Sequence, residues 1–535
     1  MNSPFACKLE TNYCPTDDEV QEIQELLIIP CQQLDALDAR VQEMRRAIDK
    51  VIERRNEILT YVAAHKALLS PIRRLPLDIL QEIFISCLPG DRNCALNASE
   101  APLVLGRVCS YWREITHSTP FLWSKLHFVD PSSTSGASPS SSCTRYKAQQ
   151  WLDAASVWLT RSGCCPLSIS LYGPGNPSAE ALPHELEQGT VFRFLKALLP
   201  FSSRWSDLKF IMPKANLTAL KQVSPSDVPL LKTLCLVDEG MGYHQFGDNW
   251  DRLCCLNLLG GPQLSRFDIS ALGILLGRLP LIWENLTEID VDGTHTDAGE
   301  VLVALSKCSR LVSCAFAIGM GVTHSADIVE LASLKNLTLR IAYSTSSLAF
   351  LHNLWAPSLR SFALVASSVN PELTVDIGTL SGFFRGTNEL ETFILSPDPF
   401  PGAFVIDVLQ ALPPTIKHLQ LTPFVDQPLS NSSTLWSAAW APSSVRTASS
   451  LDHVIEILTQ PHICPNLNTF KLNSAHTSEK AVIAFVEARR LKNINITFHR
   501  PPEIGIKASF VGSQVVVNYP NHISFSSRAG LPTLL

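Results

Sequence analysis

Three short stretches decide the fold: LKTLCL (231–236), LSRFDI (264–269) and LTEIDV (286–291). Each has apolar residues at its first, fourth and sixth positions, so the last two lie on one face of an extended strand. The pattern occurs eleven times between Trp205 and Ile496, in steps of 22 to 33 residues with one step of 51. A recurrence of this length predicts a stack of similar structural units.

Helical spacing occurs between these strands, as in SALGILLGRLP (270–280), AGEVLVALSKC (298–308) and HVIEILTQ (453–460). Each unit therefore has one apolar strand face and one apolar helix face, which become buried only when neighbours stack. The array resembles leucine-rich repeats over residues 148–499, although no Asn consistently follows each strand. The resemblance implies an irregular, curved α/β solenoid. A single βαβ sheet domain has the same periodicity, but eleven units are too many for it.

Several segments bound or interrupt the array. PLSISLYG (166–173), after the helical stretch 146–163, is expected to complete the first helix–strand unit. The Ser-rich residues 131–143 predict a linker over 129–147, and residues 500–535 are expected to form a C-terminal tail. The long step spans 422–466, which indicates an insertion or a degenerate repeat.

The N-terminal part is expected to be helical. Thr16 and Glu19 have capping-box spacing, which predicts a short helix that ends before Pro30, within a tail of residues 1–30. A coiled-coil helix is expected over 31–70, where apolar residues recur in alternating steps of three and four. Arg55 is the single polar residue at a position of this seam. The apolar residues are Leu34, Leu37, Val41, Met44, Ile48, Val51, Ile58 and Val62.

Two interpretations of this seam stay open. A homodimer through residues 34–62 is one, and a helix that folds back on its own chain or stands alone is the other. The basic residues of RRAIDKVIERR (45–55) are interleaved with acids, which favours a solvated helix face over a nucleic-acid arm.

A small all-α module is predicted over residues 71–128. Pro76 suits a first helical turn, where a missing N–H costs nothing, and an apolar stripe follows it. A second helix is expected from Leu103, and TPFLWSKL (119–126) adds a third apolar segment. A module this small commonly gains stability by sharing an apolar face with a partner.

Six residue pairs follow one another in this module: Leu75-Pro76, Ile79-Leu80, Ile83-Phe84, Val108-Cys109, Trp112-Arg113 and Leu122-Trp123. Their order and spacing resemble an F-box, and the whole layout resembles the expanded F-box families of mushroom-forming fungi. The resemblance implies docking on a Skp-type adaptor that connects to a cullin ligase core. The adaptor-binding residues implied are Leu75, Pro76, Ile79, Leu80, Ile83, Phe84, Val108, Cys109, Trp112, Leu122 and Trp123. Residues 87–101 lengthen the link between the first two helices and are expected to loop out.

The middle residue of each Leu-x-Leu is expected on the concave face of the array. These residues are Lys209, Cys235, Asp268, Asp290, Ala315, Thr338, Ala363, Ile394, Gln420, Lys471 and Asn495. They differ in charge and polarity and therefore do not indicate a class of ligand. The group from Ala315 to Ile394 is the least polar and is our candidate for a protein-contact patch, with Asp290 beside it as a further candidate for target binding.

Composition and motifs exclude several classes of protein. Of the 535 residues, 46% are hydrophobic and 17% charged, with a net charge of −6, so neither global disorder nor a general nucleic-acid-binding surface is expected. The fifteen cysteines form no Cys-x-x-Cys pair, which favours reduced, buried thiols. Neither an export signal nor a membrane span is recognisable, and a cytoplasmic or nuclear protein is expected.

Enzymatic motifs are lacking as well. The sequence holds no Gly-x-Ser-x-Gly elbow, phosphate loop or His-Glu-x-x-His helix. DVDGTHTDAGE (290–300) clusters acids and a histidine, but a polar loop leading to a helix start fits it better than a metal site. No cofactor or metal is expected.

Two functions from different classes follow. One is a non-catalytic substrate receptor of an SCF-type ubiquitin ligase, with the repeats holding an unknown protein target. The other is a repeat scaffold or sensor with a helical dimerisation cap, unrelated to ubiquitin. Binding of a Skp-type adaptor discriminates between them.

Overall fold

The computed structural model describes most of the chain. The described residues are 3–131, 142–173, 189–238, 256–270, 276–318, 327–341, 345–366, 377–397, 400–422, 451–474, 477–489, 491, 493–498 and 515–519. The chain divides into two compact units, Met1–Ile83 and Phe84–Leu535, which we describe separately.

The first unit is dominated by one long helix, α1 (Asp17–Leu68), after a 3₁₀ turn η1 (Ala6–Lys8). The predicted cap is present: the Thr16 backbone N–H donates to Glu19 Oε2 at 3.0 Å. The predicted break at Pro30 is wrong, because α1 continues through it without interruption. Proline removes one hydrogen bond and crowds the preceding turn, and a helix fifty-two residues long absorbs that local cost.

A short helical segment completes this unit and leads into the second. It consists of a 3₁₀ turn η2 (Pro71–Arg74) and the helix α2 (Leu77–Ser86), which begins directly after Pro76 as the sequence predicts. Among the described residues, no helix combines the length and the hydropathy needed to cross a bilayer.

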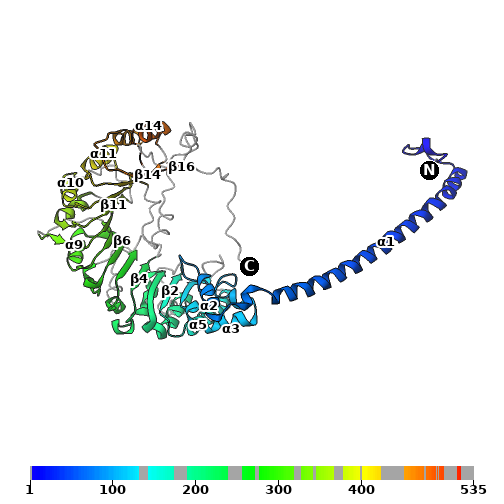
Figure 1. The fold of residues 1–535 in the computed structure, drawn as a ribbon, viewed down its shortest axis with the longest axis horizontal. Helices are drawn as coiled ribbons and strands as arrows, with labels where there is room; N and C mark the ends of the chain where they lie inside the picture. Colours follow the sequence, from blue (N-terminus) through cyan, green and yellow to red (C-terminus); the bar gives the residue numbers. More distant parts are fainter. Residues whose placement is uncertain are drawn as a thin grey trace. The chain divides into compact units, whose positions relative to one another are not determined.

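The second unit is built on a parallel sheet, as expected for an α/β solenoid. Its described strands pair in the order β1-β2-β3-β4-β5-β6-β7-β9-β11-β12-β13-β14-β15-β16, always with parallel neighbours, and Figure 1 shows them along the inner side of an arc. Their bounds are β1 (Lys125–Val129), β2 (Leu167–Tyr172), β3 (Trp205–Ile211), β4 (Thr233–Val237), β5 (Arg266–Ser270), β6 (Glu288–Thr296), β7 (Ser313–Ile318), β9 (Asn336–Ile341), β11 (Ser361–Ala366), β12 (Thr392–Leu395), β13 (His418–Leu421), β14 (Thr469–Ser474), β15 (Asn493–Phe498) and β16 (Val515–Asn518).

The outer side of the arc is irregular. It carries α-helices (Figure 1), whereas other connections between strands contain 3₁₀ turns. A separate two-stranded sheet is formed by β8 (Val329–Glu330) and β10 (Leu354–Trp355). The helices are α5 (Ser142–Arg161), α7 (Thr190–Leu198), α9 (Ala298–Ser306), α10 (Ile377–Arg385), α11 (Gly402–Ala411), α13 (Asp452–Leu458) and α14 (Glu479–Arg489). The 3₁₀ turns are η5 (Leu199–Arg204), η6 (Lys214–Leu220), η7 (Pro225–Asp227), η8 (Asn257–Gly260), η9 (Leu276–Arg278), η10 (Trp283–Asn285) and η11 (Thr345–Asn353).

The register of the strands confirms the repeat pattern read from the sequence. Leu208 of β3 pairs with Leu234 of β4, which pairs with Phe267 of β5, and the same column continues to Ile494 of β15. These residues are buried, and the column two residues further along each strand is buried with them. Stacking thus removes the apolar strand faces from water, which no single repeat could do.

Main-chain hydrogen bonds connect successive repeats just before each strand, in an array where no Asn consistently follows each strand. The carbonyl oxygen of Lys232 accepts the N–H groups of both Ser265 and Arg266, at 3.0 Å each. The carbonyl of Ser265 likewise accepts from Thr287 and Glu288 in the next repeat, and the arrangement recurs at Thr287, Val312, Lys335, Arg360, Glu391 and Lys417. Because only main-chain atoms take part, the sequence needs no conserved residue type there.

The array begins earlier than predicted, because β1 lies inside the stretch assigned to the F-box and forms the edge of the sheet. The insertion 87–101 does not loop out as expected. Ala95 forms a parallel bridge with His127 of β1, and Asn93 hydrogen-bonds Ser168 and Ser170 of β2. The insertion therefore covers an edge strand that would otherwise expose unpaired backbone groups.

The predicted linker does not separate two independent domains. The ring of Trp123, in the 3₁₀ turn η4 (Pro120–Trp123), packs edge-on against Trp158 of α5 with centroids 4.9 Å apart. Trp123 Nε1 also donates to the Thr116 carbonyl at 2.8 Å. The end of the helical module and the start of the array thus share one core, although residues 132–141 of the predicted linker lie outside the described residues.

The C-terminal end also extends past its predicted limit. The strand β16, from the expected tail, pairs with β15, and the Tyr519 hydroxyl donates to the buried Glu479 at 2.9 Å. Residues 423–450 lie outside the described residues. Because β13 pairs directly with β14, the long step is an insertion relative to the sheet and adds no strand between them.

The shared tryptophan core generates a stability prediction. Trp123→Ala should lower the free energy of unfolding of the second unit by about 3–5 kcal/mol, because it leaves a cavity at a fully buried site and removes the ring that packs against Trp158. Trp355→Ala removes an equally large side chain that is 45% exposed and serves as the control. Thermal unfolding followed by circular dichroism measures both, and equal melting temperatures for the two variants would contradict the shared core.

Candidate functional site

The helix α2 presents two apolar faces. Leu80 and Phe84, one turn apart, are buried at 1% and 0% exposure. Ile79 and Ile83, also one turn apart, are 44% and 37% exposed, and Leu77 at the start of the helix is 50% exposed. One face therefore belongs to the interior of the chain, and the other is apolar surface left in water.

The structure divides the predicted adaptor-binding residues into three groups by their exposure. Pro76, Ile79, Ile83, Val108 and Cys109 are exposed, and Leu75 and Trp112 are half-buried. Leu80, Phe84, Leu122 and Trp123 are buried, so their assignment to a contact surface needs correction. The sequence pattern marks apolar residues and does not separate those that stabilise the module from those that face outward.

The second predicted helix is shorter than expected. A 3₁₀ turn η3 (Leu105–Arg107) precedes it, and the helix α3 (Ser110–Ser118) begins only after Cys109. Cys109 Sγ accepts the Trp112 N–H at 3.4 Å and caps the helix, so the thiol is a capping group rather than part of an apolar packing face. The Trp112 ring packs on Phe84, with centroids 4.7 Å apart.

Exposed apolar residues also occur around α3. Val108 is 58% exposed, Tyr111 49% and Phe121 45%. Tyr111 escaped the sequence analysis because tyrosine is common on protein surfaces and breaks no pattern. These three exposed side chains lie within fourteen residues of one another in the sequence.

The predicted concave residues form one continuous column. Lys209 pairs with Cys235, Cys235 with Asp268, Asp268 with Asp290, and the column runs on through Ala315, Thr338, Ala363, Ile394, Gln420 and Lys471 to Asn495. These side chains lie on the sheet face opposite the buried columns. The prediction of their common alignment is therefore confirmed.

A charged cluster lies on this face. Arg340 of β9 is 1% exposed and forms a two-pronged ion pair with Asp290 of β6, with Nη1 to Oδ1 at 2.7 Å and Nη2 to Oδ2 at 3.2 Å. Arg266 of β5 donates from Nε to Asp268 Oδ2 at 3.2 Å and from Nη1 to Glu288 Oε2 at 2.9 Å. Planar guanidinium groups suit such bidentate pairing.

Small side chains make the long reach of Arg340 possible. The strand β7 lies between β6 and β9, so Arg340 must extend across it to meet Asp290. The residues of β7 in register with Asp290 and Arg340 are Ala315 and Ala317. A larger side chain at either alanine would occupy the path of the guanidinium.

Burial sets the proton affinity of the acids here. Desolvation raises the pKa of Asp268 to about 6, although Arg266 opposes the change, and the charge of Asp290 adds to it. Partial burial also raises the pKa of Asp292, which the positive charge of Arg340 partly offsets. With Glu288, four acids thus share a face with two arginines, and the stability of the site depends on pH.

This cluster changes the expectation for target binding. Asp290 is already bound by Arg340, and Ala363 is 3% exposed, so neither offers free surface. Ala315, Thr338 and Ile394 are half-buried on the inner face, and their contact with a target stays a prediction. The sequence analysis missed Arg340, which lies 50 residues from Asp290. A charged residue following the buried Leu337 and Leu339 was the available signal.

The acidic segment 290–300 leads into the start of the helix α9, as the sequence favours. Asp297 caps α9 by accepting the N–H groups of Gly299 at 2.7 Å and Glu300 at 3.2 Å. Glu300 in turn accepts the Leu276 N–H at 3.0 Å. Within the described ranges, no group of three or more His, Cys, Asp or Glu side chains is arranged to hold a metal ion.

The cysteines divide by burial. Cys94, Cys235, Cys308, Cys314 and Cys464 are buried free thiols, as the sequence analysis favours, whereas those at positions 7, 14, 31, 87, 109 and 164 are exposed. Burial raises the pKa of Cys94 to about 11 and that of Cys308 to about 12. The thiols of these two residues stay protonated at neutral pH and are poor nucleophiles.

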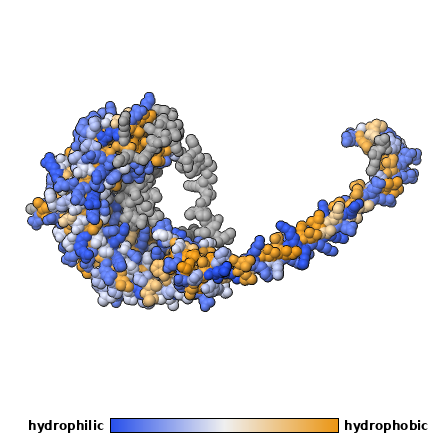
Figure 2. Space-filling model, viewed as in Figure 1, coloured by the Kyte–Doolittle hydropathy of each residue, from blue (hydrophilic) through white to orange (hydrophobic). Residues whose placement is uncertain are grey.

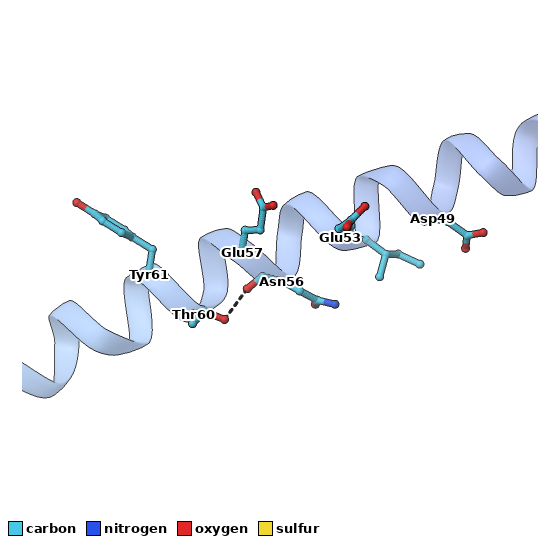
Figure 3. A pocket seen from close by; sticks show the side chains of 7 residues that line it. Asp49, Glu53, Asn56, Glu57, Thr60 and Tyr61 are labelled. Atoms are coloured by element: carbon cyan, nitrogen blue, oxygen red, sulfur yellow. Dashed lines mark hydrogen bonds between the residues drawn. The ribbon is translucent and has the colours of Figure 1, made fainter.

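A shallow hollow along α1 is shown in Figure 3. It is lined by Asp49, Ile52, Glu53, Asn56, Glu57, Thr60 and Tyr61. All seven residues come from one helix, so no second element closes the hollow. Small-molecule sites are enclosed and mostly apolar, and we assign no ligand to this one.

The ion pair generates a first prediction for the inner face. Asp290→Leu alone should lower the free energy of unfolding by about 3–5 kcal/mol, because it removes the carboxylate that is hydrogen-bonded to the buried Arg340. Asp290→Leu combined with Arg340→Met should recover most of that loss. Denaturant unfolding measures each variant, and equal losses in the single and double variants would show that the charge pair is not the cause.

A second prediction concerns pH. The folded-state pKa of Asp268, about 6, lies above that of an unfolded aspartate, so folding is favoured by protonation. The contribution of this group is complete below pH 4 and is lost as the pH rises through 6. The free energy of unfolding of the Asp268→Asn variant, relative to that of the wild type, should therefore rise by up to about 3 kcal/mol between pH 4 and pH 7. A difference in unfolding free energy that stays constant with pH would contradict this.

Comparison with known proteins adds little. No protein-family model matches the chain, and no curated protein matches its sequence. Among solved structures, the Rad7 and Elc1 complex of yeast is similar over 70% of this chain and 92% of that chain, at 14% identity and a TM-score of 0.29. A similarity at this TM-score carries no inference about the function of the chain.

Proposed function

We propose that this chain is the target-binding subunit of an SCF-type ubiquitin ligase. Residues 71–123 dock on a Skp-type adaptor, which links them to a cullin ligase core, and the repeat array holds a protein target. The chain performs no bond chemistry itself. Holding a target beside the conjugating enzyme raises its effective concentration, and that is the catalytic contribution of a receptor.

The second apolar face of α2 carries the proposal. A ten-residue helix needs one apolar stripe to pack on its own chain, and Leu80 with Phe84 supply it. Ile79 and Ile83 nevertheless face solvent directly after Leu75-Pro76, the dipeptide through which the segment resembles an F-box. An exposed apolar helix face of this kind suits insertion into a groove of a partner.

Exposed apolar residues of the second unit support the same interpretation. Val108 and Tyr111 flank the start of α3, and Phe121 lies just beyond its end, each with at least 45% of its surface in water. Burying them costs no loss of internal packing, since they contribute little to the core. Contact with a partner would remove this apolar area from water at a gain of about 25 cal/mol per Å².

The array supports a binding role for the second half of the chain. Its inner face is formed by parallel strands. The side chains on this face change from the charged group around Asp290 and Arg340 to the less polar Thr338 and Ile394. Extended surfaces of stacked repeats are used for protein recognition. A receptor of this type would act in the cytoplasm or the nucleus, where the ubiquitin machinery operates.

A second function is favoured by a separate observation. The Trp123–Trp158 contact, the strand β1 and the bridge from Ala95 build the end of the helical module into the array. A capping role for these helices in a repeat scaffold unrelated to ubiquitin would explain that fusion without any adaptor. It leaves the exposed face of α2 unexplained.

Adaptor binding by the full chain tests the proposal. Ile79→Glu with Ile83→Glu should weaken binding of a purified fungal Skp-type adaptor by about 100-fold, because it places charge in the apolar contact. Both residues are exposed, so the melting temperature should stay within a few degrees of the wild type. Val303→Glu, on α9 of the array and 50% exposed, is the matched control and should bind normally.

Two results would decide against the receptor. A wild-type chain that is folded yet shows no adaptor binding at micromolar concentration favours the capped scaffold instead. Adaptor binding that survives the double substitution would show that α2 is not the docking element.

A further inference from the structure

The helix α1 carries an apolar seam that is exposed in the part of the chain that the structure describes. None of its residues is buried, and the eight seam residues from Leu34 to Val62 are 38% to 67% exposed. Figure 2 shows apolar surface along the length of this helix with hydrophilic residues beside it. Helices in proteins owe most of their stability to the packing of such a face, so α1 calls for a partner helix.

The continuity of α1 through Pro30 lengthens this seam. The heptad that contains Leu34 continues toward the N-terminus through Leu27, Ile23 and Val20. The resulting a positions are Val20, Leu27, Leu34, Val41, Ile48, Arg55 and Val62, and the d positions are Ile23, Pro30, Leu37, Met44, Val51, Ile58 and His65. The seam is therefore interrupted mainly by Pro30 and Arg55 until its end at His65.

We propose that α1 pairs with α1 of a second copy of this chain as an antiparallel coiled coil, with the two-fold axis between Gln42 and Glu43. At the centre of this pair Val41 faces Met44 of the partner subunit. Further out, Leu37 faces Ile48 of the partner subunit. Pairing of α1 does not depend on the function proposed above.

The length of α1 fits this axis. The helix extends from Asp17 to Leu68, and its midpoint falls between Gln42 and Glu43. Antiparallel pairing in this register therefore covers the whole helix, about 78 Å at 1.5 Å per residue. No turn at either end is left without a neighbour.

The two irregular seam residues fit it as well. In a parallel pair, Arg55 would lie beside the same residue of the second copy, and so would Pro30. In the antiparallel register, Arg55 faces the partner's Pro30. The positive charge then meets a small uncharged side chain, and the two like charges stay far apart.

Charges beside the seam favour the same orientation. Asp38 and Arg45 both occupy e positions, which meet each other across an antiparallel pair. Asp38 then faces Arg45 of the partner subunit, and symmetry supplies this opposite-charge contact twice. A parallel pair instead sets Arg40, at a g position, against the partner's Arg45, which gives two repulsive contacts.

Sliding the helices by one heptad is unfavourable in either direction. One shift brings Arg40 against the partner's Arg40 and Asp38 against the partner's Asp38. The opposite shift brings Arg45 against the partner's Arg45. The register centred between Gln42 and Glu43 avoids these like-charge contacts.

Apolar residues flank the seam where this register can use them. Leu26 is 42% exposed at a g position and faces the partner's Tyr61, which is itself 65% exposed. Ile52 at an e position is 45% exposed and faces the partner's Cys31. Pairing thus removes apolar area on both sides of the seam as well as within it.

Charge reversal in the full chain distinguishes the orientations. Sedimentation equilibrium should show a wild-type dimer, and Arg45→Asp should raise its dissociation constant about tenfold by setting two pairs of acids against each other. Asp38→Arg should have a similar effect, and the double variant D38R/R45D should restore the wild-type value. Arg46→Asp, on the outer side of the same turn, is the control and should change little.

Each other outcome overturns the antiparallel pair. In a parallel dimer, Arg45→Asp would create an attraction to Arg40 and tighten association. A wild-type chain that stays monomeric at tens of micromolar, or an Arg46→Asp variant as weak as Arg45→Asp, would also be inconsistent with it.

Cross-linking through the native Cys31 gives an independent test of orientation. Cys31 is exposed, and Ile52→Cys places a second thiol opposite it only in the antiparallel pair. Leu26→Cys places one opposite it only in a parallel pair. A short bismaleimide, followed by mass spectrometry of the linked peptides, should join residues 31 and 52 of different copies. A link between residues 26 and 31 of different copies would refute the proposal.

Discussion

The parallel register across the strands of the array is the constraint on which the second unit depends. Each repeat contributes a short strand with two buried apolar residues, such as Phe267 and Ile269, that have no core of their own. Only the next repeat, in the same register, covers them. A slip of one residue would turn the apolar column toward the inner face, so the register is fixed by burial. Main-chain bonds such as those to the Lys232 carbonyl then hold the repeats together without demanding a particular side chain. This division of labour explains how the outer elements vary from α-helix to 3₁₀ turn while the sheet stays regular.

The same constraint shapes the inner face. Residues aligned by the register meet across strands, which lets Asp290 and Arg340 form a buried pair across the alanines of β7. Buried ion pairs cost desolvation and are retained where they fix an arrangement or serve binding. In this chain the pair removes Asp290 from the set of free surface groups. The proposed contact of the inner face with a target would then involve the less polar neighbours of Asp290 and the rest of the column.

Sequence periodicity predicted the repeats well because burial repeats with them, and it located every strand from β3 to β15 of the sheet. It failed where the deciding contact is long-range or local in geometry. The edge strand β1 and the bridge from Ala95 depend on residues far apart in the chain, and β16 lies beyond the last Leu-x-Leu. Pro30 looked like a helix end because its cost is local, whereas the length of α1 is set by the whole seam. For the candidate docking residues, the pattern found the apolar positions but could not show that Ile79 is exposed and Leu80 buried. Both side chains are branched and aliphatic, and only the folded structure separates them.

The direct pairing of β13 with β14 has a consequence for variation among related chains. Those strands meet in register although a long segment joins them, so the sheet places no demand on the length of that connection. Related chains can therefore differ in the length of this connection without a change in the register of β13 and β14, provided that they keep the buried residues Val454, Ile455 and Leu458 of α13.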